Sequence, residues 1–329
     1  MDRKSAIFCI ALVFAVLCLP GTSFAQDWIW ARGNLHTHTT NSDGNMPPEF
    51  VADWYKTHGY QFLVISDHSK YTDVTPLDTD PNDGFVLIGG EELGVRGAKR
   101  PIHANAIGIS ATIPDPTALT RPGKSLKNLV EVIRKAGGIP QVNHPNFGWS
   151  LTHREILEIQ GPYLMEIANC HPAVNNAGDY AYLPVEQTWD ILLSNGRTVY
   201  ATATDDAHNL NPEKPGGAMP GKGWIYVRVR EITPTAILDG IRKGDFYAST
   251  GVQLEDFSFN GKEFQVKVIP KSGEKYLIRF VGKWGQILQE TDGTSAIYRV
   301  KAAHEPNAYV RAKVICTDGT VAWTQAFRL

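Results

Sequence analysis

The sequence is poor in cysteine and nearly balanced in charge. Only 4 of its 329 residues are cysteines, and two of these lie among the first 25 positions. Cys170 and Cys316 remain, far apart in the sequence, so they allow one disulfide but exclude a disulfide framework. The 32 Lys and Arg residues nearly balance the 34 Asp and Glu residues, and no long basic run is present. This balance argues against a nucleic-acid-binding surface.

Only one apolar run is long, and it lies at the start of the chain. Arg3 and Lys4 precede an unbroken apolar stretch from Ala6 to Leu19, and small residues follow up to Ala25. This arrangement is typical of a secretory signal peptide, and the stretch is too short to span a bilayer. We therefore predict a signal peptide over residues 1–25 and an exported protein, periplasmic or secreted, with no membrane anchor after cleavage.

Residues 26–250 have the pattern of an α/β protein. Helical signals lie at Pro47-Pro48, at Ser125 as an N-cap, at Glu186 to Ser194 and at Thr233-Pro234. The runs between them are continuously apolar, as buried parallel strands are. These runs are Gln61 to Ser66, Phe85 to Ile88, Ala104 to Ile109, Ile139 to Val142, Leu164 to Ala168 and Thr198 to Thr202. The alternation predicts a parallel sheet or barrel.

The pattern changes after about residue 250, where the helical period disappears. Segments such as EFQVKVIP and KYLIRFVG alternate apolar and polar residues, and turn signals such as SGEK and TDG separate them. We predict a small antiparallel β-sandwich domain over residues 251–329, appended to the α/β domain.

Histidines and carboxylates lie at the ends of nearly all the predicted strands of the α/β domain. They are His36 and His38, Asp67 and His68, Glu91 and Glu92, His103, His144, His171, and Asp205, Asp206 and His208. The carboxyl ends of parallel strands meet on one face of a sheet or barrel, so these side chains should converge there.

Each of these signals is weak by itself. A lone H-x-H such as His36 and His38 is more often a pair of surface or satisfied core histidines, and Asp67 could cap a helix. Taken together they would form a cluster with strong mutual repulsion unless cations held it. The shared position therefore predicts a multinuclear metal site.

The motifs also resemble a known family. HTHTTNSDG, ISDH, GGEEL, HANAIG, VNHP, MEIAN and TDDAH occur in the order and at the spacing of the PHP (polymerase and histidinol phosphatase) superfamily, across roughly residues 33–210. The signal peptide, GDFYASTG and the C-terminal segment ending in AWTQ resemble an exported branch with carbaryl-hydrolase-like metallohydrolases. The resemblance implies a distorted (β/α)7 barrel with two or three divalent metal ions.

The resemblance also implies which residues bind these metals. The first metal would be bound by His36, His38, a glutamate and Asp206, the second by Asp43, His68 and His208, and the third by the same glutamate, His103 and His144. We assign the glutamate to Glu92, with Glu91 as the alternative. Many family members carry histidine at the position of Asp43. Mixed imidazole and carboxylate ligands suit Zn or Mn first, and Fe as a further candidate.

Such a centre is suited to hydrolysis of a small-molecule ester. Two cations can hold a bridging hydroxide and neutralise the oxyanion that forms. We predict a phosphoesterase acting on a phosphate mono- or diester. The alternative is a carboxylic ester, carbamate or amide hydrolase on the same centre, and a metal-stabilised binding protein without activity ranks last.

Further candidates lie near the predicted mouth of the barrel. His171 is the candidate general acid or substrate contact, and Glu166 and Asn169 are candidates for contacts to the ligands or the substrate. Three basic residues of the loop GVRGAKRP could bind a phosphate, or could simply be solvated. They are Arg96, Lys99 and Arg100.

Overall fold

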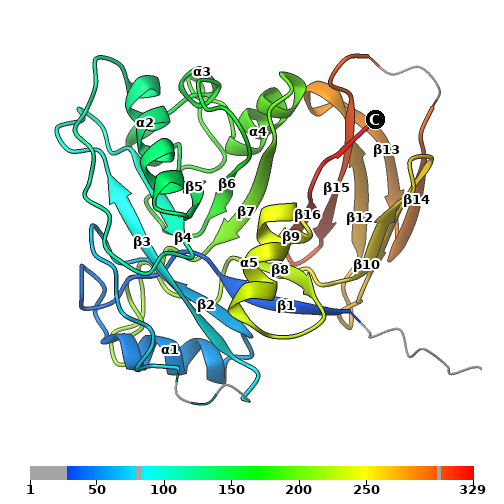
Figure 1. Cartoon of the computed structure of the whole chain (residues 1–329). Coiled ribbons are helices and arrows are strands. Elements are labelled where there is room, and N and C mark those ends of the chain that lie inside the picture. Colours follow the sequence, from blue (N-terminus) through cyan, green and yellow to red (C-terminus); the bar gives the residue numbers. More distant parts are fainter. Residues whose placement is uncertain (1–27, 79, 81–82, 302–304) are drawn as a thin grey trace, which may run out of the picture.

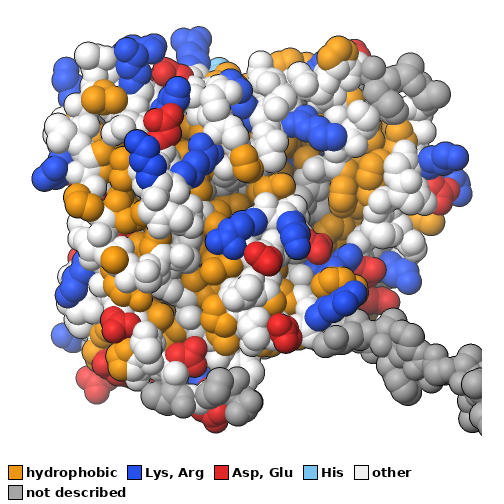
Figure 2. Space-filling model, in the orientation of Figure 1, with side chains coloured by type: hydrophobic (Ala, Val, Ile, Leu, Met, Phe, Trp, Pro, Cys, Tyr) orange, Lys and Arg blue, Asp and Glu red, His pale blue; other side chains and the backbone are white. Residues whose placement is uncertain are grey.

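The computed structural model (Figure 1) describes residues 28–78, 80, 83–301 and 305–329. The predicted signal peptide, residues 1–25, lies outside these ranges. None of the helices in the described ranges combines the length and the apolar character that crossing a membrane requires. On the face shown in Figure 2, basic side chains are spread among polar and hydrophobic ones.

A mixed sheet of 14 strands forms the centre of the structure. The strands of the α/β part are β1 (Ile29–Asn34), β2 (Phe62–Ile65), β3 (Val86–Gly94), β4 (His103–Ile107), β5 (Ile139–Val142), β6 (Tyr163–Asn169), β7 (Val199–Thr204), β8 (Trp224–Val229) and β9 (Phe246–Ser249). They are hydrogen-bonded in the order β9-β8-β1-β2-β3-β4-β5-β6-β7. The α/β class is as predicted, and the arrangement is consistent with a PHP-type barrel.

The strands are not all parallel, which corrects the expected repeat. β1-β2, β2-β3, β5-β6 and β6-β7 are parallel pairs. β4 instead runs antiparallel to both β3 and β5, and β8 runs antiparallel to β1 and β9. Parallel neighbours need a long crossover, usually a helix, and the β3–β4 connection at residues 95–102 contains no helix. β4 therefore begins at the end of the sheet where β3 finishes, and it runs in the opposite direction.

Within the described ranges, five α-helices accompany the sheet. They are α1 (Pro48–Thr57), α2 (Pro122–Lys135), α3 (His153–Ile156), α4 (Val185–Ser194) and α5 (Pro234–Lys243), with short 3-10 turns η1 (Phe147–Trp149) and η2 (Lys283–Gly285). Thr233 caps α5 and Gly244 ends it in the left-handed conformation, as predicted. The predicted N-cap Ser125 is wrong. α2 begins three residues earlier at Pro122, because proline fits the first helical position, and the Ser125 hydroxyl accepts a bond from the Leu119 N–H.

The C-terminal strands are antiparallel, as their alternation predicts. β12 (Tyr276–Val281), β13 (Ile287–Asp292), β15 (Tyr309–Cys316), β16 (Val321–Thr324) and β17 (Phe327–Arg328) belong to the large sheet, and β10 (Leu254–Phe259), β11 (Glu263–Val268) and β14 (Ser295–Arg299) form a second one. The sheets pack through the Phe280 ring, which contacts Phe264 and Tyr298 at centroid distances of 5.4 and 5.5 Å.

This segment is joined to the α/β part through backbone pairing. β16 pairs with β9, so the large sheet continues from one part into the other. The Gln325 side chain also bonds the backbone N–H and C=O of Ala201 on β7. A separate sandwich domain over residues 251–329 stays a prediction. Cys170 and Cys316 both carry free thiols, so the disulfide that their number allows is not formed.

A buried ion pair fixes the C-terminal sheet to α4. The Arg311 guanidinium on β15 donates from Nε and Nη2 to the two carboxylate oxygens of Asp190, both at 2.8 Å. The Tyr309 hydroxyl donates to the same carboxylate at 2.7 Å, and Glu186 accepts a further bond from Arg311 at 2.9 Å. Both partners are almost fully buried, so removal of the arginine leaves the Asp190 charge without compensation.

We therefore expect Arg311→Met to destabilise the protein by roughly 3–5 kcal/mol, measured by urea unfolding. The control is Arg279→Met on β12, whose pair with Glu290 is largely exposed and should be worth at most about 1 kcal/mol. Equal losses in the two variants would contradict the role assigned to the buried pair.

Candidate metal centre

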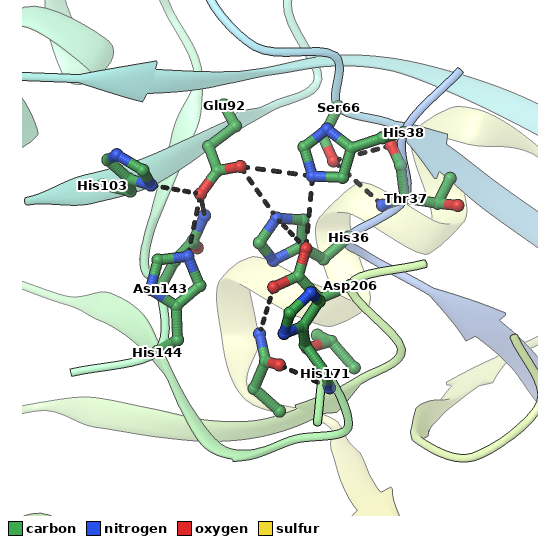
Figure 3. A network of polar contacts seen from close by, with 12 residues as sticks. His36, Thr37, His38, Ser66, Glu92, His103, Asn143, His144, His171 and Asp206 are labelled. Carbon is green, nitrogen blue, oxygen red and sulfur yellow. Dashed lines mark hydrogen bonds and ion pairs between the residues drawn. The ribbon is translucent and has the colours of Figure 1, made fainter. Parts of the chain in front are cut away.

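The strand ends bring the predicted ligands to one place (Figure 3). His36 and His38 follow β1, His68 follows β2, and His144 follows β5, while Asp206 and His208 follow β7. His103 begins β4, and it reaches the same face because β4 runs antiparallel to its neighbours. The cluster therefore combines the carboxyl ends of several strands with the amino end of one.

Glu92 is located inside a strand, which corrects the expectation that it follows one. β3 pairs with β2 over residues 86–89 and continues alongside β4 over residues 90–94. Successive side chains of a strand point to opposite faces, so only one of the two adjacent glutamates can reach the cluster. The structure places Glu92 there, whereas the Glu91 carboxylate accepts a bond from the Ile113 N–H at 2.9 Å.

Four fully or almost fully buried side chains form the inner group of ligands. They are His36, His38, Glu92 and Asp206. The two Nε2 atoms of the histidines lie 3.1–3.2 Å from Glu92 Oε2 and both lie 3.2 Å from Asp206 Oδ1. His38 Nε2 and Asp206 Oδ1 make no hydrogen bond within the part of the chain that the structure describes. Two imidazole nitrogens and two carboxylate oxygens facing one another form a donor set that fits a divalent cation.

The outer group surrounds Asp43, whose side chain is 56% exposed. Its carboxylate oxygens lie 3.4 Å from His208 Nε2, 3.6 Å from His38 Nδ1 and 3.7 Å from His68 Nε2. Asp43, His68 and His208 are the three residues predicted for the second metal, and His38 lies close to them in addition. A neutral imidazole accepts through only one ring nitrogen, so His38 can serve either the inner or the outer group.

The third group centres on the other oxygen of Glu92. His103 Nδ1 and His144 Nε2 each lie 3.1 Å from Glu92 Oε1, as the resemblance implies. The compact set of possible ligands, however, combines Glu92 and His103 with His68 in place of His144. His68 Nδ1 lies 3.2 Å from Glu92 Oε2. Glu92 is therefore in contact with all three groups.

The buried carboxylates of the centre favour positive charge on the imidazoles beside them. Burial lowers the pKa of His36, but the carboxylates of Asp206, Glu92 and Glu166 outweigh it and raise that pKa well above its usual value. Burial likewise opposes protonation of His38, yet the adjacent carboxylates of Asp206 and Glu92 raise its pKa to about 9. Burial raises the pKa of Glu92, but the surrounding imidazoles lower it well below its ordinary range. The site thus stabilises positive charge at its centre.

Buried polar side chains hold the ligands in place. Glu166 on β6 contacts His36 Nδ1 at 2.7 Å and accepts bonds from the His144 N–H at 2.6 Å and the Thr204 hydroxyl at 2.6 Å. The amide of Asn169 donates to Glu166 at 2.9 Å and to Asp206 Oδ2 at 3.0 Å. The predicted substrate contact of Asn169 does not fit, because its side chain is fully buried and bonds protein groups.

The sequence did not predict the supporting role of Asn143 and Asp67, although Asp67 was among the candidates at the strand ends. Asn143 donates to Glu92 Oε1 at 2.9 Å and to Asn105 at 2.8 Å. Asp67 accepts from Thr39 N–H at 2.7 Å and from the hydroxyls of Thr39 and Ser42 at 2.8 Å, which fixes the turn that carries Asp43. Their place directly before His144 and His68 was the only signal in the sequence.

The centre opens into a pocket of about 310 Å³. It is lined by Asp43, His68, Glu92, His103, His144, Phe147, His171, Asp206 and His208. His171 Nδ1 accepts a bond from the Ala173 N–H at 3.1 Å, so in the neutral ring the proton is on Nε2. Burial and the neighbouring imidazoles of His208 and His144 lower the pKa of His171.

The three basic residues lie beside this pocket. Arg96, Lys99 and Arg100 are exposed and line a cleft of about 470 Å³ that shares His68 and His103 with the pocket. The guanidinium of Arg100 donates to the carbonyl of Trp149. Arg96 and Lys99 are therefore the better placed of the three to meet an anion.

Comparisons with known proteins give partial relatives. No family model matches the sequence. The chain is 30% identical to a 5'-3' exoribonuclease of Haemophilus influenzae over 110 residues, which cover 32% of this chain and 40% of that protein. It is 24% identical to the DNA polymerase/3'-5' exonuclease PolX of Bacillus subtilis over 221 residues, 60% of this chain and 38% of that protein. The chain thus spans less than half the length of these relatives.

Solved structures with a similar arrangement include a two-domain protein of Bacteroides vulgatus that contains a predicted PHP-like metal-dependent phosphoesterase. The TM-score is 0.47 at 17% identity, with 87% of this chain and 90% of that chain covered. A metal-dependent phosphoesterase of Bifidobacterium adolescentis has a TM-score of 0.38 at 14% identity, with 56% and 90% covered. The Bacteroides vulgatus protein is described as PHP-like, which is the family that the motifs resemble. The carbaryl-hydrolase-like branch stays a prediction.

We expect His36→Ala and Asp206→Ala to lower the metal bound by the metal-loaded protein by about one ion per chain, because each removes a donor from the buried inner group. Elemental analysis after gel filtration measures the loss. His153→Ala, on α3 and outside the cluster, should bind as much metal as the parent protein. Unchanged metal content in both ligand variants would refute the metal centre.

Glu166→Gln should weaken metal binding about 10- to 100-fold, since the uncharged amide no longer supports the imidazole of His36. Equilibrium dialysis against Zn or Mn gives the affinity. Glu131→Gln on the exposed face of α2 is the matched control and should leave the affinity unchanged. A Glu166→Gln variant with the parent affinity would show that this carboxylate only supports packing.

Proposed function

We propose that the chain is an exported, metal-dependent hydrolase of the PHP type, and that it acts as a phosphoesterase on small phosphate mono- or diesters. The observation that carries the proposal is the convergence of imidazoles and carboxylates around Glu92 at the base of an open pocket. When bound, two or three divalent ions, Zn or Mn before Fe, supply Lewis acidity and a nucleophile at neutral pH.

The residues divide into a buried part and an accessible part. The inner group is almost fully buried, although Glu92 and Asp206 also line the pocket, and it holds its charge in a low-dielectric environment, where electrostatic interactions are strong. The outer group is reached from the pocket, because Asp43 is more than half exposed. Purely structural metal sites are closed, so the accessible donors support a catalytic centre over a metal-stabilised binding protein.

His171 is the proposed proton donor to the leaving group. Its ring lines the pocket next to His208, with the ring centroids 5.4 Å apart. The bond from the Ala173 N–H to Nδ1 leaves the Nε2–H group as a hydrogen-bond donor to the leaving-group oxygen. A general acid must lie within hydrogen-bond reach of the atom that it protonates, and the shared pocket provides for that.

The charge of the adjoining cleft supports a phosphate ester over a neutral ester. Arg96 and Lys99 face the cleft from the loop between β3 and β4, where they attract an anionic substrate. The alternative, hydrolysis of a carboxylic ester, carbamate or amide, uses the same centre without these cations. Export is part of the proposal and rests on the signal-peptide pattern of residues 1–25.

A substrate panel tests the reaction. We expect the metal-loaded mature protein to hydrolyse nitrophenyl phosphate or bis-nitrophenyl phosphate faster than nitrophenyl acetate or a nitrophenyl carbamate, measured as kcat/KM. Lys99→Ala should reduce kcat/KM for the phosphate esters by about tenfold and leave the neutral esters unaffected, because it removes only charge attraction. Lys127→Ala on α2 is the control. Turnover of the acetate or carbamate alone would establish the alternative, and no turnover at full metal loading would refute a hydrolase.

A further inference from the structure

Phe147 is the one hydrophobic side chain among the residues that line the metal pocket. All the other lining residues are carboxylates or imidazoles. The Phe147 ring lies edge-on to two of them, with centroid distances of 5.2 Å to His144 and 6.4 Å to His171. The pocket therefore has one apolar wall beside an otherwise charged floor.

This ring has no place in the hydrophobic core of the described residues. It belongs to neither of the two core clusters and is not among the partly buried side chains packed against them. Its side chain is partly exposed at the pocket. Removing a phenyl ring from water is favourable, and a ligand bound in the pocket could cover the Phe147 ring in this way.

The loop that carries Phe147 is held in an unusual conformation. His144 and Trp149 have φ angles of 24° and 53°, a region that residues other than glycine rarely adopt. The Asn146 amide bonds the carbonyls of Asn175 and Leu183 at 2.9 and 3.0 Å. Two contacts to the connection between β6 and α4 thus keep this backbone in a conformation that it would otherwise seldom populate.

Three further contacts hold this loop. The ring of Trp149 stacks on Tyr182 at a centroid distance of 4.5 Å, and Arg100 donates to the Trp149 carbonyl. The Ser150 hydroxyl donates to the Phe147 carbonyl at 2.6 Å. The Phe147 ring is therefore a preorganised wall, which a ligand can contact without ordering a mobile loop.

We propose that Phe147 is a specificity-determining residue that contacts the leaving group and selects phosphate esters of planar, apolar alcohols such as phenols. This inference rests on the proposed phosphoesterase function. In the step, an oxygen from water bonds to phosphorus, the bond from phosphorus to the aryl oxygen breaks, and the phenolate takes up a proton. The pocket volume of about 310 Å³ suits a phosphate with one ring.

The chemistry of the pocket agrees with such a leaving group. His171 is the single candidate donor of a proton among the lining residues that are not assigned to a metal. A phenol has a pKa of about 10, as tyrosine does, so a phenolate departs with less help from a general acid than an alkoxide needs. An aryl ester thus fits both the apolar ring of Phe147 and the weak acidity of His171.

The test compares an aryl and an alkyl ester. In the metal-loaded mature protein, Phe147→Ala should lower kcat/KM for phenyl phosphate by about tenfold or more and leave methyl phosphate within about threefold of the parent. Phe147→Tyr, which keeps the ring, should retain most of the preference, and Phe147→Leu should not. For Phe147→Ala, the inhibition constant of phenylphosphonate should likewise rise about tenfold relative to that of methylphosphonate.

Controls separate this inference from the proposed function. Trp284→Ala, an exposed aromatic on η2, should change neither substrate, and metal content should be the same in all variants. If the parent hydrolyses phosphate esters and Phe147→Ala or Phe147→Leu slows both substrates equally, the selection by Phe147 is refuted while the function stands. If the parent hydrolyses neither ester, the proposed function fails. The dissociation constants of the two phosphonates, measured by calorimetry on the metal-loaded parent and variants, then test the apolar wall independently, and an unchanged ratio refutes it.

Discussion

The burial of one carboxylate, that of Glu92, is the constraint on which the rest of the site depends. A buried charge without partners is strongly unfavourable, and Glu92 is about 1% exposed. Its two oxygens lie within 3.2 Å of imidazole nitrogens from five different histidines. These histidines come from the ends of β1, β2, β4 and β5, so the strands must meet at this point for the carboxylate to be satisfied.

This convergence depends on the reversal of chain direction between β3 and β4. Glu92 lies where β3 pairs with β4 on one side and forms a parallel bridge with His68, just after β2, on the other. The two glycines before it allow close packing, since a Cβ on Gly90 would lie 2.4 Å from the side chain of Val64. Because β4 returns antiparallel, its first residue, His103, faces the same centre as residues that follow parallel strands. An all-parallel sheet would place His103 at the opposite end.

The sequence could predict most members of the cluster because each one lies next to an apolar run, whereas Asp43 came only from the family resemblance. It could not separate Glu91 from Glu92, since that choice depends on which face of β3 meets the cluster. The antiparallel β4 was missed because periodicity reports burial and carries no strand direction. The bond between Arg311 and Asp190 joins residues 121 positions apart, and the wall formed by Phe147 depends on a loop conformation that no local pattern indicates.

His38 lies between the inner and the outer group, and the distances from its two ring nitrogens indicate which group it belongs to. Its Nε2 atom lies 3.2 Å from both carboxylates of the inner group, whereas its Nδ1 atom is 3.6 Å from Asp43. A neutral imidazole has one acceptor nitrogen, and the shorter distances commit it to the inner group. The outer group then retains three protein donors, Asp43, His68 and His208. All three of these side chains line the pocket, so this group is accessible from it.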